Sequence, residues 1–161
     1  MRTMVTIGVY GFDAGTFLHR LRDADVCLLL DVRQRRGVRG AEYAWANSLR
    51  LQSALAGAGI GYEHHPELAP TTELRRLQYA EDARQHVGKR ARRELAAEYI
   101  RRYTAEILDD ADLSRIVRTG RTAALLCVER DAAACHRSLI ARRLAADYGI
   151  SIEHLVPNSV A

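Results

Sequence analysis

The sequence contains few cysteines and no long hydrophobic run, and both shortages limit what the protein can be. Its three cysteines, Cys27, Cys127 and Cys135, are an odd number, which favours free thiols over a disulfide framework. No apolar stretch approaches the roughly 20 residues that a membrane-spanning helix needs. The first thirty residues also lack the basic region, apolar stretch and cleavage site of a secretory signal. We therefore expect a cytoplasmic protein without a membrane partner.

Lysine is scarce as well, because Lys89 is the only lysine among the 24 lysine and arginine residues. The formal net charge is +4. This net positive charge leads us to expect an anionic partner, either a small molecule or a nucleic acid. Solvated basic surface is the alternative explanation, so the charge alone does not identify the partner.

Short apolar segments alternate with helical patterns along the 161 residues. The apolar runs predict strands at 3–10, 26–32, 60–64, 123–128 and 150–156. Helical spacing is found over 13–22, 47–58 and 138–148, with Asp13 and Asn47 at expected N-cap positions. The segment 72–118 is strongly charged and predicts further helices, including a long one over 91–108.

This alternation predicts an α/β fold with a mostly parallel sheet of about five strands and helices on both faces. We expect one domain over residues 1–157, a helical insertion over about 72–118 before the fourth strand, and a frayed tail at 158–161. The 48% hydrophobic content is sufficient for one core. In such sheets, ligands bind at the carboxyl ends of the strands.

The segment that connects the fourth predicted strand to the next helix carries the clearest indication of chemistry in the sequence. Cys135, His136, Arg137 and Ser138 lie at the start of this helix, where free backbone N–H groups and the helix dipole favour thiolates and bound anions. Three interpretations remain open. Cys135 is a nucleophile, or Arg137 and the helix bind an anion, or these residues only cap and pack the helix.

Other polar residues fall at the ends of the predicted strands. Asp31 and Arg33 alternate at the end of the second strand, so they can pair with each other or orient a substrate. His64, or its neighbour His65, offers a general base at the end of the third strand. We expect Asp31 and Cys135 to be the catalytic residues. The expected ligand-binding residues are Arg33, His64, Glu129, His136, Arg137 and Ser138.

The cysteines and histidines also raise the question of a metal site. Cys127, Cys135 and His136, with His64 and His65, offer zinc ligands. The two cysteines are too far apart in the sequence for a zinc knuckle, and the usual paired short spacings are absent. Cys127 is expected to point into the core instead. The sequence therefore predicts no metal and no cofactor.

The loop after the second strand combines positive charge with aromatic rings. This mixture is typical of surfaces that bind single-stranded nucleic acid or a nucleotide base. A tryptophan buried under its own loop is the alternative. The residues concerned are Arg35, Arg36, Arg39, Tyr43 and Trp45.

Several segments resemble the family known as domain of unknown function 488. They are Thr6-Ile7-Gly8, Leu29-Leu30-Asp31-Val32-Arg33, Gly59-Ile60-Gly61-Tyr62 with Pro66-Glu67-Leu68, Leu125-Leu126-Cys127 and Cys135-His136-Arg137-Ser138. The last of these is the most specific. The chain departs from the commoner family pattern after Arg33, where a proline-containing stretch is usual, and after Gly8, where His-Ser is usual. The resemblance implies a small α/β domain with a polar pocket, and it implies no established activity.

Our first hypothesis is a strand-end pocket for an anionic ligand, either a nucleotide or a phosphorylated metabolite. Arg33 and Arg137 would hold the anion, Asp31 and Glu129 would orient them, and Cys135 would be the nucleophile. The alternatives are a nucleic-acid-binding module that uses the loop 33–45, and a partner-binding domain without catalysis. The sequence does not indicate an oligomeric state.

Overall fold

One five-stranded sheet forms the centre of the protein in a computed structural model, which describes residues 3–118 and 120–157. The strands are β1 (Thr3–Ile7), β2 (Leu28–Asp31), β3 (Gly61–His64), β4 (Ala123–Leu126) and β5 (Ser151–Leu155). Their order across the sheet is β3-β2-β4-β1-β5, and each neighbouring pair is parallel. The predicted α/β class is confirmed, and the described strands are all parallel. The predicted tail at 158–161 lies outside the described residues.

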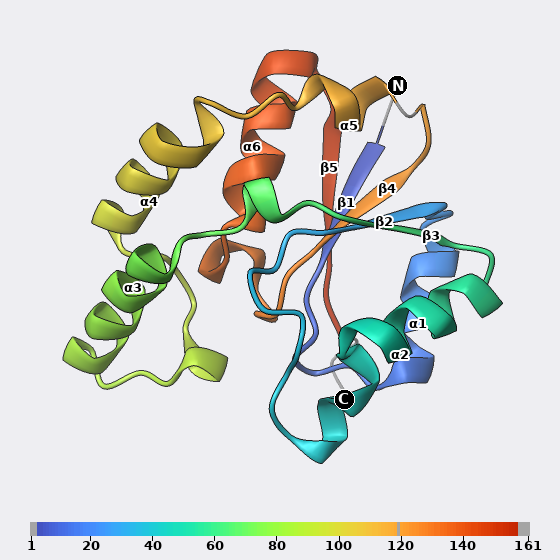
Figure 1. The fold of residues 1–161 in the computed structure, drawn as a ribbon, viewed down its shortest axis with the longest axis horizontal. Coiled ribbons are helices and arrows are strands. Elements are labelled where there is room, and N and C mark those ends of the chain that lie inside the picture. Colours follow the sequence, from blue (N-terminus) through green and yellow to red (C-terminus); the bar gives the residue numbers. More distant parts are fainter. Residues whose placement is uncertain (1–2, 119, 158–161) are drawn as a thin grey trace.

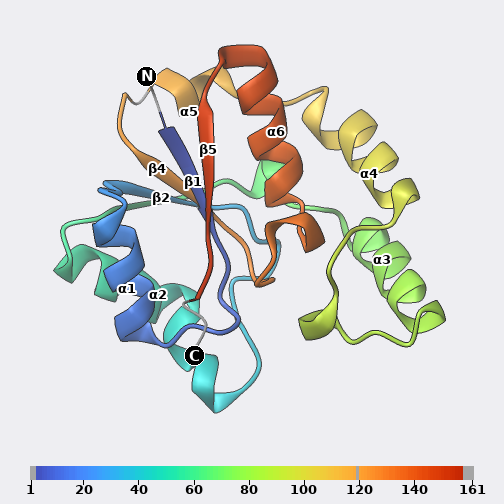
Figure 2. The ribbon, with the colours of Figure 1, turned by 180° about the vertical axis from the view of Figure 1, so that it is seen from behind.

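Helices cover both faces of the sheet, as predicted (Figure 1). One face packs against α1 (Ala14–Asp23) and α2 (Ser48–Gly57). The other packs against α5 (Ser114–Arg118) and α6 (Arg137–Tyr148). Farther out on this second side lie α3 (Thr72–Arg84) and α4 (Ala97–Tyr103), side by side in both views (Figures 1 and 2).

The central strand β4 shows why both faces are needed. All four of its residues are buried, and they alternate between two hydrophobic clusters. Ala123 and Leu125 belong to the cluster that contains α6 residues, whereas Ala124 and Leu126 belong to the cluster that contains α1 and α2 residues. A strand buried on both faces reads as a continuous apolar run, which is how the sequence identified it.

The boundaries of three predicted strands and one predicted N-cap need correction. The fourth strand ends at Leu126 rather than at residue 128. The first strand ends at Ile7 rather than at residue 10, because the N–H groups of Val9 and Tyr10 both turn to the carbonyl oxygen of Val128, at 2.9 and 3.1 Å. The second strand covers only 28–31. Asn47 is in the predicted N-cap position, but its Oδ1 accepts from the N–H of Val38 at 2.8 Å instead of capping α2.

The helix predicted over 91–108 is wrong in its first part. Helix α4 begins at Ala97, and a π-helical turn at Thr104–Leu108 continues it. The preceding residues form a short 3₁₀ turn at Lys89–Ala91 and then an extended segment. Arg92 has an extended backbone in this segment, and its buried side chain pairs with Asp82 of α3. We call residues 85–96 the strap.

Among the described residues, no helix is both long enough and apolar enough to cross a bilayer.

Gly8 sets how closely the chain segments after β1 and β4 approach each other. A Cβ on this residue would lie 1.9 Å from the carbonyl oxygen of Glu129. Only glycine allows this contact without moving the backbone. Because Glu129 follows β4 at the carboxyl edge of the sheet, Gly8 helps to shape that edge.

Replacing Gly8 with alanine should therefore be costly. We expect Gly8→Ala to lower the free energy of unfolding by about 1–3 kcal/mol, because the new methyl group pushes against backbone that cannot yield cheaply. Gly57→Ala is the control, since no atom lies within 4 Å of a Cβ built there. Urea denaturation followed by circular dichroism measures both variants. An equal loss of stability in the two would contradict this explanation.

Candidate functional site

A cavity of about 510 Å³ opens at the carboxyl ends of β1, β2 and β4. Tyr10 contributes to it from the segment after β1, and residues 33–39 contribute from the loop after β2. Side chains of α3, the strap and α4 form another wall, and the segment 127–136 after β4 forms the floor. The connections from β2 and β4 lead to opposite edges of the sheet. Crevices at such a switch point are the usual ligand sites of parallel sheets.

The floor carries a cluster formed by Cys127, Cys135 and His136. Cys127 follows β4, and the other two residues lie immediately before α6. All three are buried, and their Sγ and ring nitrogen atoms lie within 4.8 Å of one another. The Nδ1 atom of His136 is 3.6 Å from each sulfur. The fold therefore brings together two cysteines whose separation in the sequence argued against a shared metal site.

The ring of His136 is oriented by the backbone of Val32, the residue that follows β2. Its Nε2 lies 2.7 Å from the carbonyl oxygen of Val32. A carbonyl oxygen only accepts, so Nε2 carries a hydrogen and donates it. The free nitrogen Nδ1 then faces the two sulfurs, where it can accept from a thiol, donate to a thiolate when protonated, or bind a metal ion.

The two thiols of this cluster have opposite tendencies. Burial would raise the pKa of Cys135, but hydrogen bonding with Cys127 and the positive charges of His136 and Arg137 bring that pKa well below its usual value. Burial is the main reason why the pKa of Cys127 is raised, and the hydrogen bond with Cys135 raises it further. Burial alone would lower the pKa of His136, yet the charge on Cys135 raises it. Of the two thiols, Cys135 is therefore the one whose surroundings favour the thiolate form.

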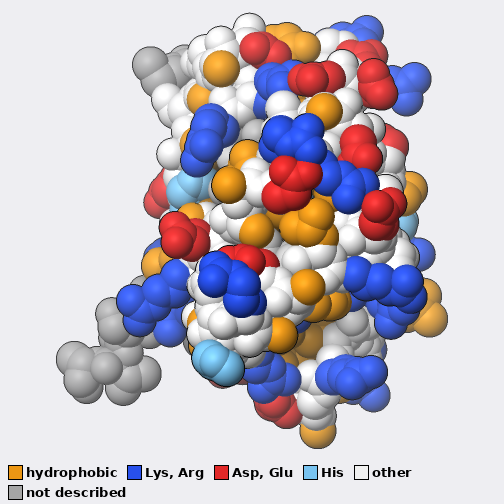
Figure 3. Space-filling view, turned by 90° about the vertical axis from the view of Figure 1, so that its left-hand side faces the viewer, with side chains coloured by type: hydrophobic (Ala, Val, Ile, Leu, Met, Phe, Trp, Pro, Cys, Tyr) orange, Lys and Arg blue, Asp and Glu red, His pale blue; other side chains and the backbone are white. Residues whose placement is uncertain are grey.

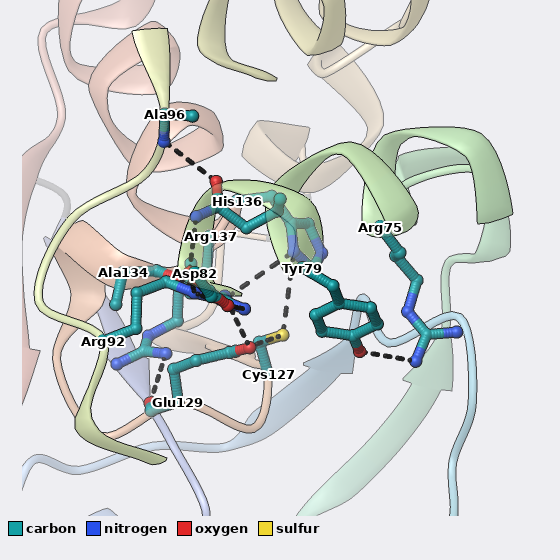
Figure 4. A network of polar contacts seen from close by, with 12 residues as sticks. Arg75, Tyr79, Asp82, Arg92, Ala96, Cys127, Glu129, Ala134, His136 and Arg137 are labelled. Atoms are coloured by element: carbon teal, nitrogen blue, oxygen red, sulfur yellow. Dashed lines mark hydrogen bonds and ion pairs between the residues drawn. The ribbon is translucent and has the colours of Figure 1, made fainter. Parts of the chain in front are cut away.

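Arg92 of the strap joins three parts of the chain (Figure 4). Its guanidinium donates to both carboxylate oxygens of Asp82 on α3, at 2.6 to 3.0 Å. It also donates to Oε1 of Glu129 at 3.3 Å and to the carbonyl oxygen of Ala134 at 3.2 Å. All of these bonds are buried, so they hold the strap firmly over the floor of the cavity.

This network was not predicted from the sequence, and it extends to Gln78 of α3. Gln78 Nε2 donates to Asp82 at 2.9 Å, and Gln78 Oε1 accepts from the N–H of Ala96 at 2.8 Å. A signal was present, because Leu74, Gln78 and Asp82 recur every four residues on the buried face of α3. Two polar residues in line with a buried leucine indicate a buried polar contact.

Asp31 and Arg33 pair with each other in a fully buried bidentate contact. Arg33 Nε donates to Asp31 Oδ1 at 2.9 Å, and its Nη2 donates to Oδ2 at 2.8 Å. The hydroxyl of Tyr62 donates to Oδ2 at 2.6 Å, and Arg33 Nη1 donates to the carbonyl oxygen of Ala46 at 2.9 Å. Arg33 borders the cavity, whereas Asp31 is not among its lining residues. The pair therefore fixes the loop after β2.

Arg137 lies apart from the cavity, although the sequence analysis expected it to hold the anion. Its fully buried guanidinium donates to the carbonyl oxygens of Glu129 and Arg130, at 2.7 and 3.1 Å, and to Thr6 Oγ1 at 3.3 Å. These bonds hold the segment after β4 against β1. The hydroxyl of Ser138 donates to the carbonyl oxygen of Cys135 at 2.9 Å, so it helps to close the turn before α6.

His64, the last residue of β3, and His65, which follows it, lie outside the cavity lining as well. His64 Nε2 is 3.2 Å from the carbonyl oxygen of Arg33, so it supports the loop after β2. His65 lies between the carboxylates of Glu63 and Glu67, at 2.9 and 2.7 Å. Their geometry assigns them to the support of loops rather than to contact with a ligand in this cavity.

Comparison with known proteins identifies the family of the chain. The family model described as domain of unknown function DUF488 matches residues 13–144. The chain belongs to this family. The resemblance stated from the sequence is thereby confirmed, and the matched range contains Cys127, Cys135 and His136. No curated protein and no solved structure matches the chain.

The arginine-rich loop of this DUF488 protein divides into two parts. Arg35 and Arg39 line the cavity. The other members, Arg36, Tyr43 and Trp45, contact the protein itself. Arg36 Nη1 lies 3.4 Å from the Tyr62 hydroxyl, the Tyr43 ring lies 5.3 Å from that of Tyr10, and the Trp45 ring lies 4.9 Å from that of Phe17.

The buried pair of Asp31 and Arg33 provides a test of this geometry. We expect Asp31→Asn to lower the free energy of unfolding by about 3–5 kcal/mol, because the Arg33 charge would stay buried without a carboxylate. Asp23→Asn is the matched control, since 58% of the Asp23 side chain is exposed; its stability should hardly change. Urea denaturation compares the two variants, and an equally small effect in both would contradict the buried pairing.

Proposed function

We propose that the protein binds an anionic small molecule, a nucleotide or a phosphorylated metabolite, in the cavity, and that Cys135 is the residue placed to react with it. The observation that carries this proposal is the charge of the lining. Six basic residues border the cavity and Glu129 is its one acidic lining residue within the described chain. The basic residues are Arg33, Arg35, Arg39, Arg75, Lys89 and Arg92.

Four of these basic groups have no carboxylate partner among the described residues. One of them, Arg75, donates to the neutral groups Gln34 Oε1 at 2.7 Å and Tyr79 Oη at 3.0 Å. Arg33 is engaged by Asp31, and Arg92 by Asp82 and Glu129. By contrast, no carboxylate in residues 3–118 and 120–157 forms an ion pair with the other four, which are Arg35, Arg39, Arg75 and Lys89. Guanidinium and ammonium groups gathered in a hollow are the donors that phosphate requires.

The position of Cys135 supports the reactive part of the proposal. Its sulfur borders the same cavity and lies next to the His136 ring, immediately before α6. Positive charge and the start of a helix both favour a thiolate, which is the nucleophilic form of cysteine. Tyr99 also lines the cavity, and burial raises the pKa of its phenol well above the usual value, so it remains a hydrogen-bond donor.

Nucleic-acid binding by the loop 33–45 has less support. Tyr43 and Trp45 pack against aromatic residues of the protein, so their faces are not free to stack on bases. Figure 3 shows the side of the molecule on which α3 and α4 lie, and acidic side chains are mixed with basic ones there, so this side is not the uniformly basic surface that nucleic acid favours. A hollow with clustered cations fits a small anion better.

The anion proposal is tested by two matched substitutions on α3. We expect Arg75→Gln to weaken binding of a nucleoside monophosphate or inorganic phosphate by about tenfold or more, since hydrogen bonds to charged groups contribute about 1.5–3 kcal/mol. Arg84→Gln should leave binding unchanged, because Arg84 is 72% exposed and lies outside the lining. Isothermal titration calorimetry at low salt measures both. An absence of binding to the unaltered protein, or equal losses in the two variants, would contradict the proposal.

Alkylation tests the location of the reactive thiol in reduced, metal-free protein. A bound phosphate compound should slow iodoacetamide modification of Cys135, because it occupies the cavity that Cys135 lines. Modification of the exposed Cys27 should not change, which provides a control within the same molecule. Peptide mass spectrometry reports the two rates. If the ligand slows both cysteines equally, or neither, then Cys135 does not face the bound ligand.

A further inference from the structure

We propose that Cys127, Cys135 and His136 bind a zinc ion through two thiolates and one imidazole nitrogen. The proposal does not depend on the anionic ligand, because it rests on three protein groups alone. It assigns a role to Cys127, which the proposed function leaves unused.

The distances within the cluster match those of a zinc site. Zinc binds sulfur at about 2.3 Å and histidine nitrogen at about 2.0–2.1 Å, so tetrahedral angles place a sulfur and a nitrogen ligand about 3.5 Å apart. In this protein His136 Nδ1 is 3.6 Å from Cys127 Sγ and 3.6 Å from Cys135 Sγ. Both sulfur–nitrogen distances thus match those of ligands around one ion, and the two sulfurs lie within 4.8 Å of each other.

The surroundings of His136 fit the same role. A zinc-bound histidine usually donates its second ring N–H to a carboxylate or a backbone carbonyl, which fixes the ring and its tautomer. His136 Nε2 lies 2.7 Å from the carbonyl oxygen of Val32, and this leaves Nδ1 toward the sulfurs. Two sulfurs and one imidazole select zinc over magnesium or calcium, which prefer oxygen ligands.

The charge of the two thiolates also favours a bound metal ion. Two thiolates side by side in a buried cluster repel each other, and burying such charge without compensation is costly. A divalent cation balances both negative charges, so the bound cluster is neutral overall. Zinc binding releases two protons from the metal-free cluster, and no oxidation or reduction is involved.

Three protein ligands leave the fourth position of the ion for another group. Each of the three residues borders the cavity, so this position is available to water or to an oxygen of a bound ligand. Zinc sites with three protein ligands and one exchangeable position are typically catalytic. With zinc bound, Cys135 would act as a ligand and would no longer be a free nucleophile.

Cobalt(II) is the probe for this site, because cobalt bound to thiolates absorbs in the near ultraviolet whereas zinc does not. The full-length protein is reduced, freed of metal with a chelator and titrated with cobalt(II). We expect a thiolate-to-cobalt band that saturates at one equivalent and disappears when zinc is added. Cys127→Ser, Cys135→Ser and His136→Ala should lose this band at one equivalent.

Two variants serve as controls. Cys27 and His19 are exposed residues outside the cluster, so Cys27→Ser and His19→Ala should bind cobalt as the unaltered protein does. Far-ultraviolet circular dichroism verifies the fold of each variant. The proposal is wrong if the folded, unaltered protein gives no band, or if the band survives in folded Cys135→Ser.

A measurement on the unaltered protein avoids dependence on variants that fail to fold. Zinc should slow alkylation of Cys127 and Cys135 and leave that of Cys27 unchanged. Equal rates with and without zinc would overturn the metal site. Phosphate binding is scored separately by calorimetry, so a cobalt band without phosphate binding supports the metal site and contradicts only the anion pocket.

Discussion

The buried contact of Arg92 with Asp82 and Glu129 is the interaction on which the cavity depends. It joins the strap to α3 and to the segment after β4, two parts of the chain that are far apart in sequence. Because both carboxylates and the guanidinium are buried, removing one partner would leave charge without compensation. The bond from the N–H of Ala96 to Gln78 Oε1 also ties the strap to α3, but Arg92 is the side chain that links the strap to the floor.

Two other buried arginines hold the rest of the same edge. Arg33 fixes the loop after β2 through Asp31, and Arg137 fixes the segment after β4 through two carbonyl oxygens. Arginine suits this task because its five N–H groups form a planar fork that satisfies several acceptors at once. This edge of the sheet therefore has arginines with two kinds of contact. Arg33 and Arg137 support loops through buried bonds, whereas Arg35 and Arg39 line the cavity.

Much of the fold could be predicted from the sequence, because its signals are local. Apolar runs located the strands, and Asp13 caps α1 as its position indicated, with its Oδ1 accepting from the N–H of Thr16 at 2.8 Å. The contacts that build the site are not local. Arg92 lies 37 residues before its partner Glu129, and nothing in a helical pattern over 91–108 indicates that Arg92 interrupts it. Likewise, the separation of Cys127 from Cys135 along the chain concealed their proximity in space.

The lining of the cavity comes from separate parts of the chain. The sulfur and imidazole groups lie just after β4 and just before α6, whereas Arg75, Tyr79 and Lys89 come from the segment 72–118. In the proposed site, substitutions at Arg75 or Lys89 would therefore change the ligand that the cavity accepts, while Cys127, Cys135 and His136 would keep their positions.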